Sequence, residues 1–290
     1  MDKFLYYIVI NLSRLPLGFL YFLSDIVFFF NHYIIRYRHE IVATNLRNSF
    51  PEKSEKELKV IHKKFDRHFT DYLFESLKGL TADPEEISQR IKILNLETFN
   101  KYVGHNTNTM LLSGHVFNFE WIAFLANQAK YEMFYFAYKP LKNPYLSEQI
   151  VKLRTKVKAE GIPAKLVFKK ISEIPNNGKY AYYFLSDQSP KSPIGKPWIQ
   201  FLHQDTVVFD GYERLIREYN LATLYVEFVK VGRGQYTIEL TEFLPDNGIQ
   251  FEEGEVVRKF YDKLTQTIHN HPDNWLWSHK RWKHKRDSQI

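Results

Sequence analysis

The feature that most constrains the fold is an alternation of short apolar runs with helical stretches from residue 109 onward. The strand-like runs cover residues 109–112, 133–136 and 180–185. Residues 116–130 and 144–159 lie between them and have helical periodicity. Runs this short, and apolar at nearly every position, are typical of strands buried on both faces of a sheet. The sequence therefore predicts an α/β fold.

Two later runs predict a hairpin, which makes the expected sheet mixed but mostly parallel. They cover residues 221–230 and 235–243 and flank a turn that contains Gly232 and Gly234. Residues 252–270 return to helical periodicity. Earlier in the chain, Ser54 and Glu57 have capping-box spacing, which predicts a long amphipathic helix that begins at residue 55. We expect helices to flank the sheet.

The first 35 residues are apolar and carry few charges. Between Lys3 and Arg36, the Lys, Arg, Asp and Glu side chains are limited to Arg14 and Asp25. A helix over residues 15–35 is long enough to span a bilayer, but Asp25 would cost roughly 2.5–3.5 kcal/mol there. Two shorter helices lying in the interface, or a helical hairpin buried in the core, are the alternatives. We expect residues 1–35 to be a helical membrane anchor and residues 36–290 to form the remaining domain.

Basic residues follow the apolar segment and recur at the end of the chain. Arg36 and Arg38 come directly after it, so the positive-inside rule places that flank in the cytoplasm. Residues 279–286 include five Lys or Arg and no acid. The candidate contacts for lipid phosphates are Arg36, Arg38, Lys280, Arg281 and Lys283. The alternative for the C-terminal run is a solvated tail.

Composition narrows the partners and the chemistry. A formal net charge of +7 favours an acidic partner, such as anionic lipid, nucleic acid or an acidic protein. The absence of cysteine excludes disulfides, thiolate metal sites and a cysteine nucleophile. The C-terminal histidines have no metal-ligand spacing, and no recognisable nucleic-acid-binding fold accompanies the basic tail. We therefore expect no metal and no nucleic acid.

The strongest local signal is the segment that follows the strand at residues 109–112. Gly114 permits a tight turn there, and His115 precedes Glu120 by five positions. In a helix, five residues correspond to about 140° around the axis, so the two side chains meet only if His115 is not helical. In that geometry Glu120 would orient the imidazole, and the other ring nitrogen would act as a general base. The alternative is a histidine with a structural role at a helix start.

A second polar group follows the strand at residues 180–185. Asp187 and Gln188 come directly after it, and ligands of open α/β sheets bind beyond the carboxyl ends of strands. Two interpretations are open: Asp187 and Gln188 share a cleft with His115, or Asp187 forms an Asx-turn that ends the strand.

The motifs together resemble the late acyltransferases of lipid A biosynthesis, a branch of the lysophospholipid acyltransferase superfamily. The superfamily motif is a histidine followed by an acid after four intervening residues, here His115 and Glu120. The resemblance covers nearly the whole chain, in matching order. Its other motifs are Tyr37-Arg38, Asn45-Leu46, Phe50-Pro51, Tyr138-Lys139-Pro140-Leu141, Asn143-Pro144, Arg154 before Gly161, Asp187-Gln188, Pro272-x2-Trp275-x-Trp277 and Lys280-Arg281-Trp282-Lys283.

The resemblance implies an enzyme that transfers a fatty acyl chain from acyl carrier protein to a hydroxyl of a lipid A precursor. It places the reaction at the cytoplasmic face of the bacterial inner membrane and implies no cofactor. His115 would be the general base and Glu120 its partner, without an acyl-enzyme intermediate. Candidate substrate-binding residues are Lys139, Arg154, Asp187, Gln188 and Asn118. The aromatic residues on both sides of Asn118 depart from the family pattern and leave the acceptor open.

Two other functions fit the same residues. An acyltransferase of the same superfamily could act on a glycerophospholipid or an aminolipid, and a membrane-surface scaffold would need no catalytic histidine. The sequence does not determine acyl length, the choice between carrier protein and coenzyme A as donor, or the oligomeric state.

Overall fold

The computed structural model describes residues 2–138, 143–244 and 251–286 and has an α/β architecture. Its central sheet has seven strands in the order β1-β9-β8-β2-β5-β3-β4. The predicted fold class is confirmed: the neighbours from β8 through β2, β5 and β3 to β4 pair in parallel, as β1 does with β9, and only the β8–β9 pair within this sheet is antiparallel.

The strands lie close to their predicted positions. The sheet consists of β1 (Ile91–Ile93), β2 (Thr109–Ser113), β3 (Met133–Tyr138), β4 (Ala159–Pro163), β5 (Tyr180–Leu185), β8 (Ala222–Gly232) and β9 (Gln235–Glu242). All five residues of β2, in the middle of the sheet, are buried, which explains their uniformly apolar or small character. A separate antiparallel pair consists of β6 (Trp198–Phe201) and β7 (Gln204–Val207).

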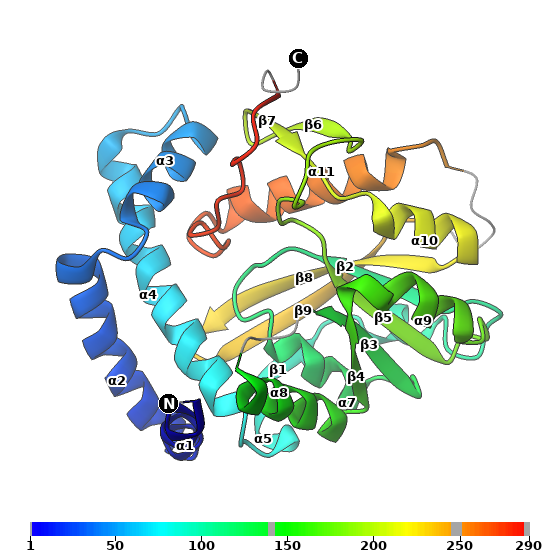
Figure 1. The fold of residues 1–290 in the computed structure, drawn as a ribbon, viewed down its shortest axis with the longest axis horizontal. Helices are drawn as coiled ribbons and strands as arrows, with labels where there is room; N and C mark the ends of the chain where they lie inside the picture. The colour runs from blue at the N-terminus through cyan, green and yellow to red at the C-terminus, as the bar shows by residue number, and fades with distance from the viewer. Residues whose placement is uncertain (1, 139–142, 245–250, 287–290) are drawn as a thin grey trace.

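Helices lie on both sides of the sheet (Figure 1). On one side are α10 (Gly211–Tyr219) and α11 (Glu255–Asn270), and on the other are α5 (Pro84–Ser88), α7 (Leu125–Gln128) and α8 (Pro144–Lys156). Shorter elements complete the α/β part: α6 (Leu96–Asn100), η3 (Ala164–Leu166) and α9 (Val167–Glu173). The core is continuous and includes Leu17 and Leu20 of the N-terminal segment.

The N-terminal region is entirely helical and lies beside the sheet (Figure 1). It comprises α1 (Asp2–Ser13), α2 (Leu17–Phe30), the π-helical turn η1 (Asn31–Ile35), α3 (His39–Ser49) and α4 (Glu55–Gly79). Pro16 lies between α1 and α2, where its ring interrupts the helix. The predicted capping box is present: the Ser54 side chain accepts from the Glu57 backbone, and the Glu57 carboxylate accepts from the Ser54 backbone.

Residues Leu17–Ile35 form the one described helix that is long and apolar enough to cross a membrane. Only 11% of this window is buried, so the alternative of a hairpin buried in the core is wrong. Its polar contacts face α4: Ser24 donates to Asp71, and His32 Nδ1 lies 2.6 Å from Asp66 Oδ2. The opposite face carries exposed aromatic and aliphatic side chains, among them Phe19, Phe22, Ile26, Phe29, Phe30, Ile34 and Ile35.

Asp25, the charge that would be costly in a membrane, is paired. Arg233, in the turn of the β8–β9 hairpin, donates to both Asp25 and Asp71, and Arg67 of α4 lies 2.9 Å from Asp25. The carboxylate of Asp25 therefore faces the protein, and one arginine joins α2, α4 and the edge of the hairpin.

The stretch at residues 116–130 is much less helical than predicted. A non-helical loop continues to Glu120 and is followed by the 3₁₀ turn η2 (Trp121–Phe124) and the single turn of α7. The reason is that the loop pairs with the C-terminal segment instead of with itself. Phe117 N–H donates to the Asn274 carbonyl, and Leu276 N–H donates to the His115 carbonyl.

Candidate active site

The register of β2 and β5 brings the two predicted polar groups together. The strands are parallel, and Ser113 at the end of β2 lies opposite Leu185 at the end of β5. His115 and Asp187 each come two residues after these partners, so they leave the same edge of the sheet side by side. A shared site at the carboxyl ends of the strands, one of the two open interpretations, is what the structure has.

Asp187 holds His115 by two hydrogen bonds. The imidazole Nδ1 lies 2.5 Å from Asp187 Oδ1, and the His115 backbone N–H donates to Oδ2 over 2.9 Å. The carboxylate side chain is 2% exposed and the imidazole 13%. The short contact between a buried acid and a half-buried ring fixes the ring's orientation and directs Nε2 away from the strand ends.

Asp187 remains ionised in this buried position. Burial by itself raises the pKa of a carboxyl group, but His115 and the hydrogen bonds that Asp187 accepts outweigh it and lower the pKa of Asp187 to about 2. One of these bonds comes from the indole Nε1–H of Trp275, 2.6 Å from Oδ2. Trp275 is therefore a supporting residue to which the sequence analysis gave no role, although its Pro272-x2-Trp275-x-Trp277 motif was noted.

Gln188 contacts the other ring nitrogen of His115, Nε2. Its Nε2 lies 3.0 Å from His115 Nε2. An amide N–H that donates to the ring requires an unprotonated Nε2, and the carboxylate of Asp187 favours the proton on Nδ1. The two contacts are compatible with an imidazole that carries a proton on Nδ1 and a lone pair on Nε2, which is the form that can accept a proton.

Gly114 allows this arrangement because there is no room for a side chain. A Cβ at this position would lie 2.6 Å from Leu264 Cδ1 of α11 and 3.4 Å from Asp187 Oδ2. The glycine is needed here for close approach to α11, which packs over the strand ends.

A pocket of about 420 Å³ opens beside His115. Its polar lining includes His115, Glu120, Tyr138, Ser147 and Gln188. The rest is mostly apolar and aromatic: Phe119, Ala137, Ala164, Val167, Phe168, Phe184, Leu185, Phe209 and Leu215. A few polar groups in a largely apolar cavity suit a ligand with a reactive head and a hydrocarbon tail.

The hydrogen bond that the sequence analysis assigned to Glu120 is made by Asp187 instead. His115 is non-helical, as that prediction required, but its Nδ1 points toward the end of β5. The physical reason is the parallel register of β2 and β5, which places Asp187 beside the His115 ring at the ends of the two strands. Glu120 lines the pocket together with His115.

The remaining predicted substrate-binding residues divide into three cases. Asn118 does not line the pocket: it is fully buried, donates to Glu75 Oε2 over 2.9 Å and accepts from the Trp121 backbone, so it stabilises the loop. Arg154 lies on α8, and its side chain lies outside what the structure describes. Lys139 lies outside the described residues.

The predicted phosphate contacts also differ from one another. Arg281 is 1% exposed and donates to the Val207 carbonyl and to Tyr261, so it is a core residue and not a membrane contact. Arg38 donates to the Ser278 carbonyl. Lys280 and Lys283 are exposed, and Arg36 lines a pocket between α3 and α4.

The first and last motifs of the chain meet in space. Asn45 of α3 donates to the carbonyls of Trp277 and His279, and the ring centroids of Phe50 and Trp277 lie 5.7 Å apart. The C-terminal segment is thereby held against the N-terminal helices while Trp275 contacts Asp187. Among the described residues, no group of three or more His, Asp or Glu side chains could hold a metal ion.

An α/β sheet with a buried Asp–His pair at its strand ends and a largely apolar pocket beside it suits general-base chemistry on a ligand with an apolar part. The family model for bacterial lipid A biosynthesis acyltransferases matches residues 2–284, and the chain belongs to this family. No curated protein sequence matches the chain significantly. The protein is therefore a lipid A biosynthesis acyltransferase, and the family implies a lipid acceptor.

Proposed function

We propose that the protein transfers a fatty acyl chain from a thioester to a hydroxyl group of a lipid A precursor, with His115 as general base. The observation that carries this proposal is the imidazole of His115, which contacts a buried carboxylate at Nδ1 and Gln188 at Nε2 and lines a largely apolar pocket.

Asp187 takes the orienting role in this mechanism. A charged carboxylate on Nδ1 fixes the tautomer and stabilises the imidazolium that forms when Nε2 accepts a proton. Glu120 is proposed to line the pocket and to position the acceptor, since Nδ1 is already occupied. The role given to Glu120 in the sequence analysis thus passes to Asp187.

The reaction needs no protein nucleophile. The acceptor hydroxyl displaces the Gln188 amide from His115 Nε2 and gives its proton to that nitrogen as its oxygen attacks the thioester carbonyl carbon. The tetrahedral intermediate collapses, the carbon–sulfur bond breaks, and the thiolate takes the proton back from the imidazolium. The products are an ester and a free thiol, and His115 is neutral again.

Acyl carrier protein is the proposed donor, and coenzyme A thioesters are the alternative. The formal net charge of +7 favours an acidic protein partner. For the acceptor, a hydroxyl of a lipid A precursor follows from the family, and a glycerophospholipid or an aminolipid is the alternative. The chemistry at His115 is the same for each of these acceptors.

We further propose that α2 lies in the membrane interface at the cytoplasmic face of the bacterial inner membrane. Tyr21 and Ser24 of α2 and His32 of η1 all bond to side chains of α4, so one face of the helical segment packs on the protein. Its other face is apolar and exposed. A helix with these two faces suits an interfacial position better than an independent span.

The test is mass spectrometry of lipid A and phospholipids from cells that lack the protein and are complemented with wild type or His115→Ala. The proposal expects lipid A to lose one acyl chain and only the wild type to restore it. Loss of an acyl group from another lipid would move the acceptor to the alternative class. No change in any lipid would overturn the proposed activity.

A further inference from the structure

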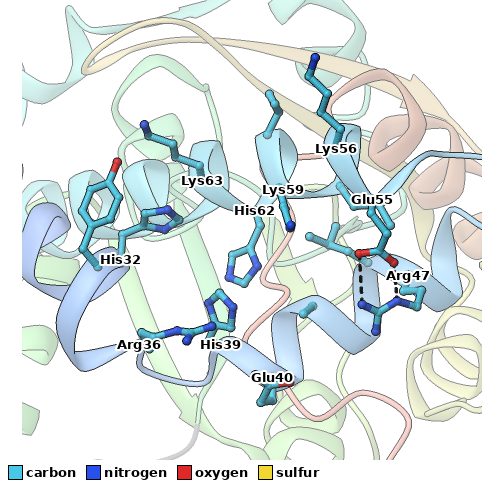
Figure 2. A pocket seen from close by; sticks show the side chains of 15 residues that line it. His32, Arg36, His39, Glu40, Arg47, Glu55, Lys56, Lys59, His62 and Lys63 are labelled. Atoms are coloured by element: carbon cyan, nitrogen blue, oxygen red, sulfur yellow. Dashed lines mark hydrogen bonds and ion pairs between the residues drawn. The ribbon is translucent and has the colours of Figure 1, made fainter.

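A second pocket lies between η1, α3 and the first half of α4, and it shares no lining residue with the pocket of His115. Its volume of about 640 Å³ is in the range of small-molecule sites. Figure 2 shows His39 of α3 facing His62 of α4, while Lys56 and Lys63, which also line the pocket, point away from these two rings. The activity proposed above does not use this pocket.

The lining is strongly basic. It contains five Lys or Arg side chains and two glutamates: Arg36, Arg47, Lys56, Lys59, Lys63, Glu40 and Glu55. One arginine is neutralised, because Arg47 Nε lies 2.8 Å from Glu55 Oε1. Within the part of the chain that the structure describes, Arg36, Lys56 and Lys59 make no ion pair. This unneutralised charge in a concave site favours an anion.

Two neutral histidines form the floor. The rings of His39 and His62 stack with centroids 4.3 Å apart. Burial is the main cause that lowers the pKa of both, and for His62 the pKa falls to about 4. His62 is 6% exposed, and its Nε2 makes no hydrogen bond in the described structure, its nearest acid being Asp66 at 3.7 Å.

The pocket adjoins the exposed apolar surface of the N-terminal segment. Tyr33 is part of both: it lines the pocket, and together with Ile34 and Ile35 it is more than half exposed. The ammonium group of Lys63 lies 5.7 Å from the Tyr33 ring centroid. A ligand with an anionic head and an apolar tail would therefore place its head among the lysines and its tail along η1.

We propose that this pocket binds the phosphodiester headgroup of an anionic phospholipid. The inference rests on the proposed membrane position of α2, and it adds a discrete lipid site to it. Diffuse attraction of a basic surface to an acidic membrane would need no pocket and no stacked histidines. The site would hold the protein at the membrane while His115 works on other lipids.

The test is vesicle flotation of the full-length protein with phosphatidylcholine alone and with phosphatidylcholine mixed with phosphatidylglycerol. The variant Lys59→Gln/Lys63→Gln removes two charges from the pocket. Its matched control, Lys64→Gln/Lys92→Gln, removes two exposed lysines outside it, one of them on the same helix. We expect the pocket variant to lose about 20- to 30-fold in affinity for the mixed vesicles, and the control less than about threefold.

Binding to phosphatidylcholine alone should be equal for all three proteins, since it depends on the apolar face of α2. Equal losses in the two variants would overturn the proposal in favour of diffuse attraction. Equal losses combined with calorimetric binding of inorganic phosphate that only the pocket variant lacks would assign the site to a soluble phosphate compound and would also overturn it.

His115→Ala separates this inference from the proposed function. We expect it to abolish transfer and to bind mixed vesicles like the wild type. If transfer depends on His115 but the pocket variant and its control bind mixed vesicles equally well, the proposed activity stands and the lipid site is refuted. If the pocket pair weakens binding but no lipid is acylated, the lipid site stands without that activity.

Discussion

The site of His115 and the basic pocket each present imidazoles near the surface, and their surroundings give them opposite properties. His115 is held by one ionised carboxylate and an amide, in a pocket that is otherwise apolar. His39 and His62 stack on each other among arginines and lysines, and burial lowers the pKa of both. A carboxylate on one nitrogen prepares an imidazole to accept a proton at the other. A ring surrounded by cations remains neutral and offers only hydrogen bonds.

The largest expected effect is on the ring itself. His115→Ala removes the general base, so the rate of acyl transfer should fall about 10²- to 10⁴-fold. The rate is measured with purified enzyme, an acyl thioester and a lipid acceptor. His62→Ala is the comparison, because it removes an imidazole from the basic pocket. A near-normal rate in His115→Ala would falsify the assignment of the base.

The next effect distinguishes the two acids near His115. Asp187→Asn retains the shape but removes the charge that orients the ring, so transfer should slow about 100-fold or more. Glu120→Gln should slow it less, because Nδ1 is bound to Asp187. Circular dichroism would show whether both variants fold. A larger loss for Glu120→Gln than for Asp187→Asn would restore the partner predicted from the sequence.

A smaller effect is expected from Trp275→Phe, which removes the indole donor to Asp187 Oδ2. The carboxylate retains its two bonds from His115. A hydrogen bond to a charged group contributes about 1.5–3 kcal/mol, so the free energy of unfolding should fall by an amount near the lower end of that range. Urea denaturation measures it. Trp282→Phe, which removes the bond to Thr206, is the control for loss of an indole donor elsewhere in the same segment.

The smallest effect concerns pH. The pKa of His62 is about 4 in the folded protein, below the ordinary value of 6.5. As pH falls below 6.5, the unfolded state binds the proton first, so this residue lowers stability progressively between about pH 6.5 and pH 4, and the full loss persists at lower pH. We expect His62→Gln to lose about 1–2 kcal/mol less than wild type between about pH 7 and about pH 5. Urea denaturation at about pH 7 and about pH 5 tests the difference; parallel curves would contradict it.

Much of the fold was predictable from local pattern. The uniformly apolar strands and the Ser54 cap depend on neighbouring residues, and each lies where the sequence indicated. The loop at residues 114–120 was not predictable in this way, because it bonds to residues near 275. Its helical periodicity arises from side chains that fill the core.

The site shows the same limit. The sequence placed His115 and Asp187 at strand ends, but the choice between Asp187 and Glu120 depends on the register of β2 against β5. Burial likewise determines which of the polar candidate residues can contact a substrate or a lipid. Asn118 and Arg281 are polar and occur in motifs, which suggested contact with substrate or lipid, but both are buried and bonded to the protein.

The contact between Gly114 and Leu264 links two positions that are far apart in the chain. A methyl group at position 114 would meet the Leu264 side chain at 2.6 Å, whereas a shorter side chain at position 264 would leave room for it. Alanine could therefore become tolerable at position 114 only after α11 had changed. In related sequences the two positions should vary together, and the glycine before the histidine should persist wherever a long side chain remains on the helix above it.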